Sequence, residues 1–499
     1  MTEPRRSPLD MDAETFRTLG RELVDQLADA LASIPARPIT PNETPDQVHE
    51  ALDASRTLPE EGAPAGELLR GLTARLFDHS LFNAHPRFFG YITAPPAPIG
   101  ILGDLVASAL NANVGSWALS PAATEIEAQT IRWIAEMIGY PTSCGGVLVS
   151  GGNMANFVGF FAARAARTGW DIRRLGNASA DGRPLAVYVS AETHTWIQKA
   201  ADLSGIGTNA IRWIETDVHQ RMDLGALRQR IAGDVSAGVA PFLVVGTAGS
   251  VSTGAIDPLA DIAAICREHD LWFHVDGAYG GFAAAADEAP ADLRALALAD
   301  SVAVDPHKWL YAPLEAGCAL VRDPRHLRDA FSYHPPYYHF DGRGPNFVDH
   351  GMQNSRGFRA LKVWLALQHA GAAGYRAMIG EDMRLARGLA DAVGEHPELE
   401  LVTQNLSITT FRYVPPDLRA SAADEKVGAY LNRLNQDLLE RLQSGGEIFV
   451  SNAVVTGRYV LRACIVNFHT SEADVAVVPG TVAREGRRAD ARLRGTSGI

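Results

Sequence analysis

Residues 301–309, SVAVDPHKW, form a short apolar strand pattern that ends in a polar turn with one lysine. Lysine is rare in this chain: among 45 lysine and arginine side chains, only four are lysine, namely Lys199, Lys308, Lys362 and Lys426. Lysine can lose its proton, whereas arginine effectively cannot. Because only a neutral amine attacks a carbonyl to form a Schiff base, we expect Lys308 to bind an aldehyde cofactor. Lys199 is expected to be a solvated or structural charge, and Lys362 and Lys426 are expected to lie on solvated helix surfaces.

Strand patterns alternate with helix patterns on both sides of this stretch. The apolar strands lie at 146–150, 185–190, 211–214, 242–245, 271–275, 301–304 and 318–321. Such strands, joined by helices, are typical of an α/β domain with a mostly parallel central sheet covered on both faces. Further helices are expected at 10–34, 66–78, 358–371 and 383–393, and a long loop at 323–355. The predicted parts are an N-terminal helical arm (1–85), a large α/β domain (86–355), a smaller C-terminal α+β domain (356–485) and a frayed tail (486–499).

The composition is that of an ordinary globular protein, with 46% hydrophobic and 21% charged residues among 499. A net charge of −13 disfavours nucleic acid and anionic membrane surfaces as partners. The four cysteines lack paired spacing, so neither a disulfide framework nor a metal site is expected. The N-terminus lacks the apolar run of a signal peptide, and no stretch reaches the ~18 apolar residues of a membrane span. We therefore expect a cytoplasmic protein.

Three further motifs follow strands of the predicted sheet. The small-residue turn in GGVLVSGGNMAN (145–156) leads into a helix whose N–H groups suit a phosphate, although a plain tight turn is an equal alternative. Asp276 ends a buried strand, where it either pairs with a cationic ring nitrogen or caps the next turn. His194 follows another strand and is either a ring contact or an ordinary loop histidine. Together with Lys308, these groups match the phosphate, ring nitrogen, ring face and aldehyde of pyridoxal phosphate.

Nine sequence blocks occur in order along most of the chain: HPRFFGY (85–91), SWALSPAATEIE (116–127), GGVLVSGGNMAN (145–156), HTWIQKA (194–200), GAID (254–257), HVDGAYGG (274–281), DPHKW (305–309), RGFRALKVW (356–364) and LRACIVN (461–467). In these blocks the chain resembles the group II pyridoxal-phosphate-dependent amino-acid decarboxylases, the family of aromatic L-amino-acid decarboxylase. The resemblance implies the PLP-dependent transferase fold of the aspartate aminotransferase type (fold type I). It also implies a homodimer with active sites at the subunit interface.

The resemblance assigns roles to individual residues. The implied catalytic residues are Lys308, which forms the internal aldimine, Asp276 at the ring nitrogen, His194 stacked on the ring, and Tyr337, which protonates the substrate carbon from a loop. The implied cofactor neighbours also include Gly152, Asn153, Ala248, Ala278, Ser301, Asp305 and His307. The implied substrate neighbours are Tyr91, Ile92, Ala94, Asn113, Gly115 and His194.

Two departures from the family pattern loosen the substrate assignment. Ala248 stands at the third position of the usual Gly-Thr-Thr segment, so a hydroxyl beside the cofactor is absent. Gly115 stands where aromatic-specific members often carry a bulky side chain, and Ile92 and Asn113 also differ. Neither departure touches Lys308 or Asp276.

The activity implied by the resemblance is decarboxylation of an L-amino acid to its amine and CO₂. The aromatic residues near the expected pocket, Phe88, Phe89, Tyr91 and Trp117, favour an aromatic substrate. One alternative is an aromatic aldehyde synthase, which the presence of Tyr337 disfavours. Others are a decarboxylase of glutamate or 2,4-diaminobutyrate, and a non-catalytic scaffold, which the intact set of site residues disfavours.

Overall fold

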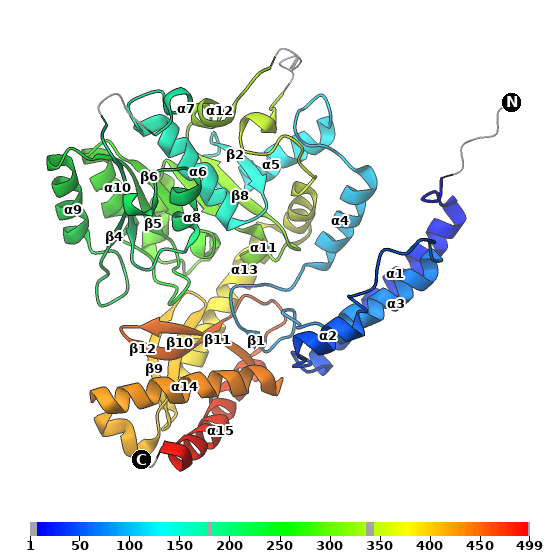
Figure 1. The fold of residues 1–499 in the computed structure, drawn as a ribbon, viewed down its shortest axis with the longest axis vertical. Coiled ribbons are helices and arrows are strands. Elements are labelled where there is room, and N and C mark those ends of the chain that lie inside the picture. Colours follow the sequence, from blue (N-terminus) through cyan, green and yellow to red (C-terminus); the bar gives the residue numbers. More distant parts are fainter. Residues whose placement is uncertain (1–6, 178–181, 336–343, 498–499) are drawn as a thin grey trace.

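The computed structural model describes residues 7–177, 182–335 and 344–497 of the chain. It contains a large α/β body, a smaller sheet with its own helices beside that body, and an N-terminal arm of helices that extends to one side (Figure 1). Within these residues, no helix is long and apolar enough to cross a membrane.

The arm is built from α1 (Ala13–Ser33), α2 (Pro45–Ala51) and α3 (Ala65–Asp78), close to the helices predicted at 10–34 and 66–78. Helix α1 begins where the Asp12 side chain accepts a hydrogen bond from the Thr15 N–H at 2.8 Å. No residue of α1 or α3 is buried, and large apolar side chains are exposed on both, namely Phe16, Val24, Leu68, Leu72 and Leu76. Their apolar stripes are therefore covered only in part within one chain.

The large body is organised around a seven-stranded sheet in the order β2-β8-β7-β6-β5-β3-β4. Its strands are β2 (Gly145–Val149), β3 (Leu185–Ser190), β4 (Ile211–Ile214), β5 (Ala240–Thr247), β6 (Trp272–Asp276), β7 (Ser301–Val304) and β8 (Gly317–Val321). Every neighbouring pair is parallel except those of β8, which runs antiparallel to both β2 and β7. The mostly parallel sheet predicted from the sequence is therefore confirmed, with β8 as its one reversed strand.

Helices pack around this sheet (Figure 1). The helices of the large body are α4 (Pro98–Leu110), α5 (Pro121–Met137), α6 (Gly152–Arg167), α7 (Ile172–Leu175), α8 (Trp196–Leu203), α9 (Leu224–Ser236), α10 (Leu259–Glu268), the short lysine turn α11 (Pro306–Trp309) and α12 (Arg325–Phe331). The prediction of an uninterrupted loop over 323–355 is wrong for α12, because Leu327 on this helix is fully buried against the body.

The smaller sheet has the order β1-β11-β12-β10-β9, with a second hydrophobic core between it and its helices. Its elements are β1 (Phe88–Phe89), β9 (Leu399–Asn405), β10 (Ile408–Tyr413), β11 (Phe449–Val455), β12 (Arg458–Cys464), α14 (Glu425–Gly445) and α15 (Glu472–Ser497). Strand β1 pairs in parallel with β11, so a segment far earlier in the chain joins this sheet. The α+β composition predicted for the C-terminal part agrees with these elements.

Helix α13 (Ala360–Glu395) connects the two cores. The sequence predicted two helices, 358–371 and 383–393, and two helical segments do meet at a kink at Gly371, whose φ of 66° and ψ of 169° are not helical. The first segment ends where predicted, and the second begins directly after Gly371, earlier than predicted. Buried residues up to Met383 belong to the large core, and those from Leu385 onward belong to the smaller one. The domain division at residues 355 and 356 stays a prediction.

Residues 486–497 are helical rather than frayed, because α15 continues through them to Ser497. The Arg494 guanidinium on α15 pairs with Asp417 at 2.8 Å, which ties this last segment to the rest of the small domain.

Lys362 also differs from expectation. It is 5% exposed, and its Nζ lies 3.1 Å from an Asp104 carboxylate oxygen on α4. Lys362 is therefore a buried structural charge that joins α13 to α4, rather than a solvated one.

Candidate active site

One cavity lies where several strands of the large sheet end. In a parallel sheet the carboxyl ends of the strands share one edge, and ligands bind beyond that edge. The cavity, together with the solvent space at its mouth, comprises about 440 Å³. It is lined by Gly152, Asn153, Asn156, Glu192, His194, Thr247, Gly249, Val251, Asp276, Ala278, Tyr279, Asp305 and Lys308. The structure thus brings together the four groups that the sequence motifs singled out.

Lys308 enters this cavity from the turn α11, directly after β7. Its Nζ lies 3.0 Å from Oδ2 of Asp305, and Nε2 of His307 lies 3.7 Å from the same oxygen. The Asp305 side chain is 2% exposed, and its Oδ1 has no hydrogen-bond partner. A buried carboxylate with one unused oxygen therefore stands beside the amine, inside the cavity wall.

Asp276 is held in place at the end of β6 by two N–H donors. The indole Nε1 of Trp196 donates to Oδ2 at 2.7 Å, and the backbone N–H of Ala278 donates to Oδ1 at 3.1 Å. Trp196 is fully buried at the start of α8. Sequence reasoning missed this role of Trp196, although the residue belongs to the quoted block HTWIQKA.

The small-residue turn lies at the N-terminus of the 16-residue helix α6. Gly151 has a φ of 139°, a conformation that favours glycine. A Cβ on Gly152 would lie 2.6 Å from Oδ2 of Asp305 and 3.0 Å from Cβ of Ala278. The lack of side chains therefore allows the backbone of the turn to approach Asp305, and the free N–H groups of the helix start are available to an anion.

His194 lies in the loop between β3 and α8. Partial removal of its ring from water lowers the pKa of His194, and the positive charges of Lys308 and Lys199 act in the same direction. The carboxylates of Asp276 and Asp305 oppose this shift without reversing it. The imidazole is therefore neutral at neutral pH.

Some residues predicted to contact the cofactor stand behind the cavity wall. The Ser301 hydroxyl accepts a hydrogen bond from Nε1 of Trp272 at 2.8 Å and lies 2.7 Å from Nδ1 of His274. Ala248 is fully buried, while its neighbour Thr247 lines the cavity with a hydroxyl that has no partner. Sequence reasoning noted the hydroxyl missing at position 248 and overlooked the one at Thr247.

The predicted substrate residues other than His194 do not line this cavity within one chain. They are Tyr91, Ile92, Ala94, Asn113 and Gly115. The departure at Gly115 has a local reason, because a Cβ there would lie 2.6 Å from the backbone oxygen of Asn354. A bulky side chain at position 115 is incompatible with this backbone.

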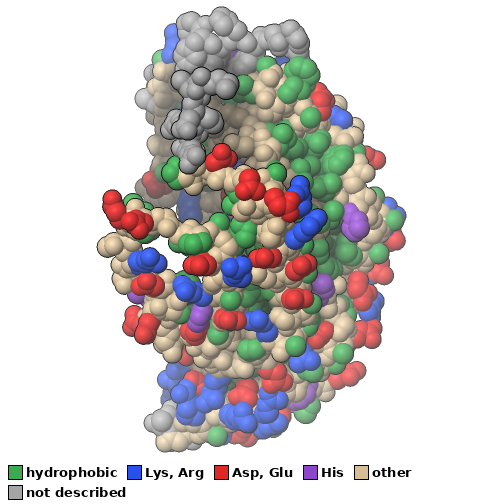
Figure 2. Space-filling view, turned by 90° about the vertical axis from the view of Figure 1, so that its right-hand side faces the viewer, with side chains coloured by type: hydrophobic (Ala, Val, Ile, Leu, Met, Phe, Trp, Pro, Cys, Tyr) green, Lys and Arg blue, Asp and Glu red, His purple; other side chains and the backbone are tan. Residues whose placement is uncertain are grey.

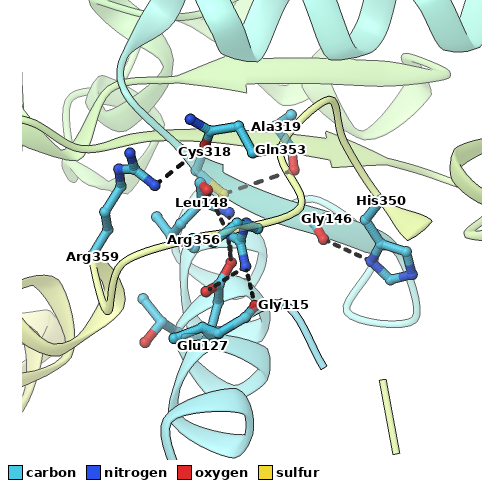
Figure 3. Close-up of polar contacts among 12 residues, drawn as sticks. Gly115, Glu127, Gly146, Leu148, Cys318, Ala319, His350, Gln353, Arg356 and Arg359 are labelled. Carbon is cyan, nitrogen blue, oxygen red and sulfur yellow. Dashed lines mark hydrogen bonds and ion pairs between the residues drawn. The ribbon is translucent and has the colours of Figure 1, made fainter. Parts of the chain in front are cut away.

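A buried ion pair fixes the 113–115 segment to the strand before the glycine turn (Figure 3). Arg356 pairs with Glu127, and these side chains are 2% and 0% exposed. Arg356 also donates to the backbone oxygens of Val114 at 2.8 Å and Leu148 at 2.6 Å. Leu148 belongs to β2, so one guanidinium connects the predicted substrate segment with the strand that leads to the glycine turn.

We expect Arg356→Met to lower the free energy of unfolding by about 3–5 kcal/mol, because Glu127 would keep a buried charge without its partner. Arg359→Met is the matched control, since its partner Glu315 is half exposed and such pairs contribute about 0–1 kcal/mol. Urea unfolding of both variants measures the difference. Equal losses below about 1 kcal/mol in the two variants would contradict a structural role for the buried pair.

The residues of the cavity fit pyridoxal phosphate. They provide an amine for its aldehyde (Lys308), a glycine-bordered helix N-terminus for its phosphate, and a carboxylate for its ring nitrogen (Asp276). The unpartnered Thr247 hydroxyl and Asp305 Oδ1 leave two buried polar atoms free for a polar ligand.

Comparisons with known proteins point in one direction. The pyridoxal-dependent decarboxylase conserved domain matches residues 45–414. The aromatic-L-amino-acid decarboxylase of Bacillus atrophaeus is 33% identical over 469 residues, which cover 93% of this chain and 94% of that protein. Phenylacetaldehyde synthase of a Rosa hybrid cultivar is 31% identical over 468 residues, with 91% and 90% covered. The crystal structure of Oryza sativa TDC with PLP and tryptamine superimposes with a TM-score of 0.88 at 30% identity, covering 97% of this chain and 99% of that one.

Proposed function

This chain belongs to the pyridoxal-dependent decarboxylase family, and from that premise we propose that it converts an aromatic L-amino acid to the corresponding amine and CO₂. The observation that carries the proposal is the meeting of the Lys308 amine, the Asp276 carboxylate and the N-terminus of α6 in one cavity. The relatives named for aromatic amino acids or aromatic aldehydes support the substrate class.

When bound, pyridoxal phosphate accepts the electron pair that remains when the substrate loses its carboxylate. In the proposed reaction, the Lys308 amine would hold the cofactor through its aldehyde. Asp276 would keep the ring nitrogen protonated, and the neutral ring of His194 would cover the face of the cofactor ring. The Asp305 carboxylate, 3.0 Å away, would keep the Lys308 amine inside the cavity once the amine is free. Gly152 and Asn153 offer backbone N–H groups to the phosphate.

A second candidate function is oxidative formation of an aldehyde, which the similarity to a phenylacetaldehyde synthase keeps open. The residue proposed to separate the two reactions is Tyr337, as the proton donor to the substrate carbon. Tyr337 lies outside the described residues, so its role rests on the resemblance alone.

The wall of the cavity also bears on substrate charge. Glu192 lines the cavity beside His194, and its carboxylate disfavours a second carboxylate in the substrate. This argues against glutamate. The same carboxylate does not disfavour a cationic substrate such as 2,4-diaminobutyrate, so an assay with both kinds of amino acid distinguishes it from an aromatic substrate.

The proposal predicts that the purified enzyme with added pyridoxal phosphate releases CO₂ fastest from aromatic amino acids, with one amine formed per CO₂. A screen of amino acids, with CO₂, amine and aldehyde quantified separately, measures this. CO₂ release from 2,4-diaminobutyrate alone would show that the substrate is not aromatic. Aldehyde as the main product would show that the enzyme is an aldehyde synthase rather than a simple decarboxylase. In the same assay, Tyr337→Phe should raise the share of aldehyde, and an unchanged amine yield would remove Tyr337 from the mechanism.

We propose that the enzyme acts as a homodimer with its active sites at the subunit interface. The arm exposes apolar side chains, and α4 adds four more, Leu102, Leu105, Val106 and Leu110. Figure 2 shows hydrophobic side chains gathered on the face of the molecule that carries the arm. A second copy on this face would cover them and would bring its cavity near the substrate segments that lie outside the first copy's cavity. Sedimentation as a monomer at micromolar concentration would contradict the dimer.

A cytoplasmic setting for the reaction remains part of the proposal. The four cysteines, Cys144, Cys266, Cys318 and Cys464, are free thiols, as suits a reducing compartment. A disulfide detected in the protein from its native cells would contradict this setting.

A further inference from the structure

A buried carboxylate that the proposed reaction does not use lies beside the lysine turn. Asp382 on α13 is 2% exposed. Its Oδ2 accepts hydrogen bonds from the indole Nε1 of Trp309 and from the hydroxyl of Tyr311, both at 2.8 Å. The backbone of Asn467 is a third donor to this carboxylate. All of these contacts present a hydrogen to Asp382, and a carboxylate accepts such hydrogen bonds more strongly than a protonated acid does.

The first donor connects Asp382 to the cavity wall. Trp309 follows Lys308 directly, and its ring stacks on Tyr279 with centroids 5.0 Å apart and planes 13° apart. Tyr279 lines the cavity, and its hydroxyl lies 2.7 Å from Oγ of Ser407. A shift of the Trp309 indole would therefore move both the backbone that carries Lys308 and an aromatic wall of the cavity.

The second donor connects Asp382 to the segment that leads into α4. The backbone oxygen of Tyr311 accepts a hydrogen bond from the Ala97 N–H at 2.7 Å. The Tyr311 ring lies parallel to that of Tyr375 and edge-on to that of Phe468. Tyr311 also has a φ of 52°, a strained conformation for a residue with a side chain, which its contacts must hold in place.

Opposing effects of burial and hydrogen bonding set the pKa of Asp382 near neutral pH. Burial raises the pKa of Asp382 to about 7, and the hydrogen bonds from Tyr311, Trp309 and Asn467 oppose the rise. The titratable groups that face it are Tyr311, Glu381 and Cys464. Asp382 is therefore ionised above about pH 7 and gains a proton as the pH falls through that value.

We propose that Asp382, as a carboxylate, is a positioning residue that fixes the turn from Lys308 to Tyr311 and so aims the Lys308 amine into the cavity. The inference rests on the proposed function, in which Lys308 binds pyridoxal phosphate. Protonation of Asp382 removes its negative charge, so its hydrogen bonds from Trp309 and Tyr311 weaken. The turn that carries Lys308 is then held less firmly, and the cofactor binds less tightly.

The first test is the dissociation constant of pyridoxal phosphate, measured on the full chain by the visible absorption of the bound cofactor. We expect Asp382→Asn to bind the cofactor about tenfold more weakly than wild type, a change equivalent to ~1.4 kcal/mol. The matched control is Asp234→Asn, because Asp234 is buried and accepts a hydrogen bond from the Tyr188 hydroxyl at 2.9 Å. This control should stay within about twofold of wild type, because the loss of one buried carboxylate far from the cavity acts on stability instead.

A second pair of variants keeps Asp382 and covers the case in which Asp382→Asn does not fold. Tyr311→Phe removes a donor that lowers the pKa of Asp382, so the loss of cofactor binding on acidification should begin at higher pH than in wild type. Tyr188→Phe should not shift that profile. Equal affinities for Asp382→Asn and Asp234→Asn, or superimposable pH profiles for Tyr311→Phe and wild type, would overturn the inference. Failure of the wild-type chain to bind pyridoxal phosphate at all would instead overturn the proposed function.

Discussion

Lys308→Ala and Lys308→Arg are both expected to release CO₂ at least about a thousandfold more slowly than the wild-type enzyme, because neither offers an amine that can lose its proton and bind the cofactor aldehyde covalently. The two variants differ in what they leave beside Asp305. Arginine keeps a cation near the buried carboxylate, whereas alanine removes the partner that lies 3.0 Å away. Stability should therefore fall more in the alanine variant, while activity is lost in both.

The measurements are CO₂ release with saturating pyridoxal phosphate and mass analysis after borohydride reduction, which traps cofactor attached to a lysine. Lys426→Ala is the control, because Lys426 is exposed on α14 in the small domain. It should keep wild-type activity and wild-type labelling. An active Lys308→Arg enzyme, or labelling that persists in both Lys308 variants, would show that another group binds the cofactor.

The fold was predictable where local pattern decides it. Strands β3, β4 and β7 coincide with the predicted ranges, because short apolar runs bounded by polar or small residues leave few other choices. Two helices were predicted over α13, and the helical backbone does break at Gly371, a residue type that commonly ends a helix. The sequence missed the segment between Gly371 and Met383, which is helical because Tyr375, Ile379 and Met383 are buried in the large core.

The site residues that lie at the ends of predicted strands could be identified from the sequence. Asp276 and Lys308 stand at or just after the carboxyl ends of β6 and β7, and the sheet topology brings them to one edge. The residues that hold them depend on tertiary packing. Trp196 is 80 residues from Asp276, and Asp382 is 73 residues from Trp309, so no local pattern in the sequence links either pair.

Asp276→Asn tests the second essential group, and we expect CO₂ release to fall about a hundredfold to a thousandfold. A carboxylate next to the ring nitrogen raises the pKa of that nitrogen, and a neutral amide does not. A change of about two to three pKa units corresponds to ~3–4 kcal/mol of lost stabilisation, which gives the expected range. Cofactor affinity should change less, because Lys308 and the N-terminus of α6 remain in place.

A cofactor methylated on its ring nitrogen separates the charge effect from a packing effect, because its ring keeps a positive charge without help from Asp276. We expect this analogue to restore a large part of the activity of Asp276→Asn and to add nothing to the wild-type enzyme. The amide also places an N–H₂ group against either Trp196 or Ala278, both of which are donors, so part of the loss should remain. If Asp276→Asn turns over at a near-normal rate, or if the methylated cofactor fails to restore any activity, Asp276 does not act through the charge of the ring nitrogen.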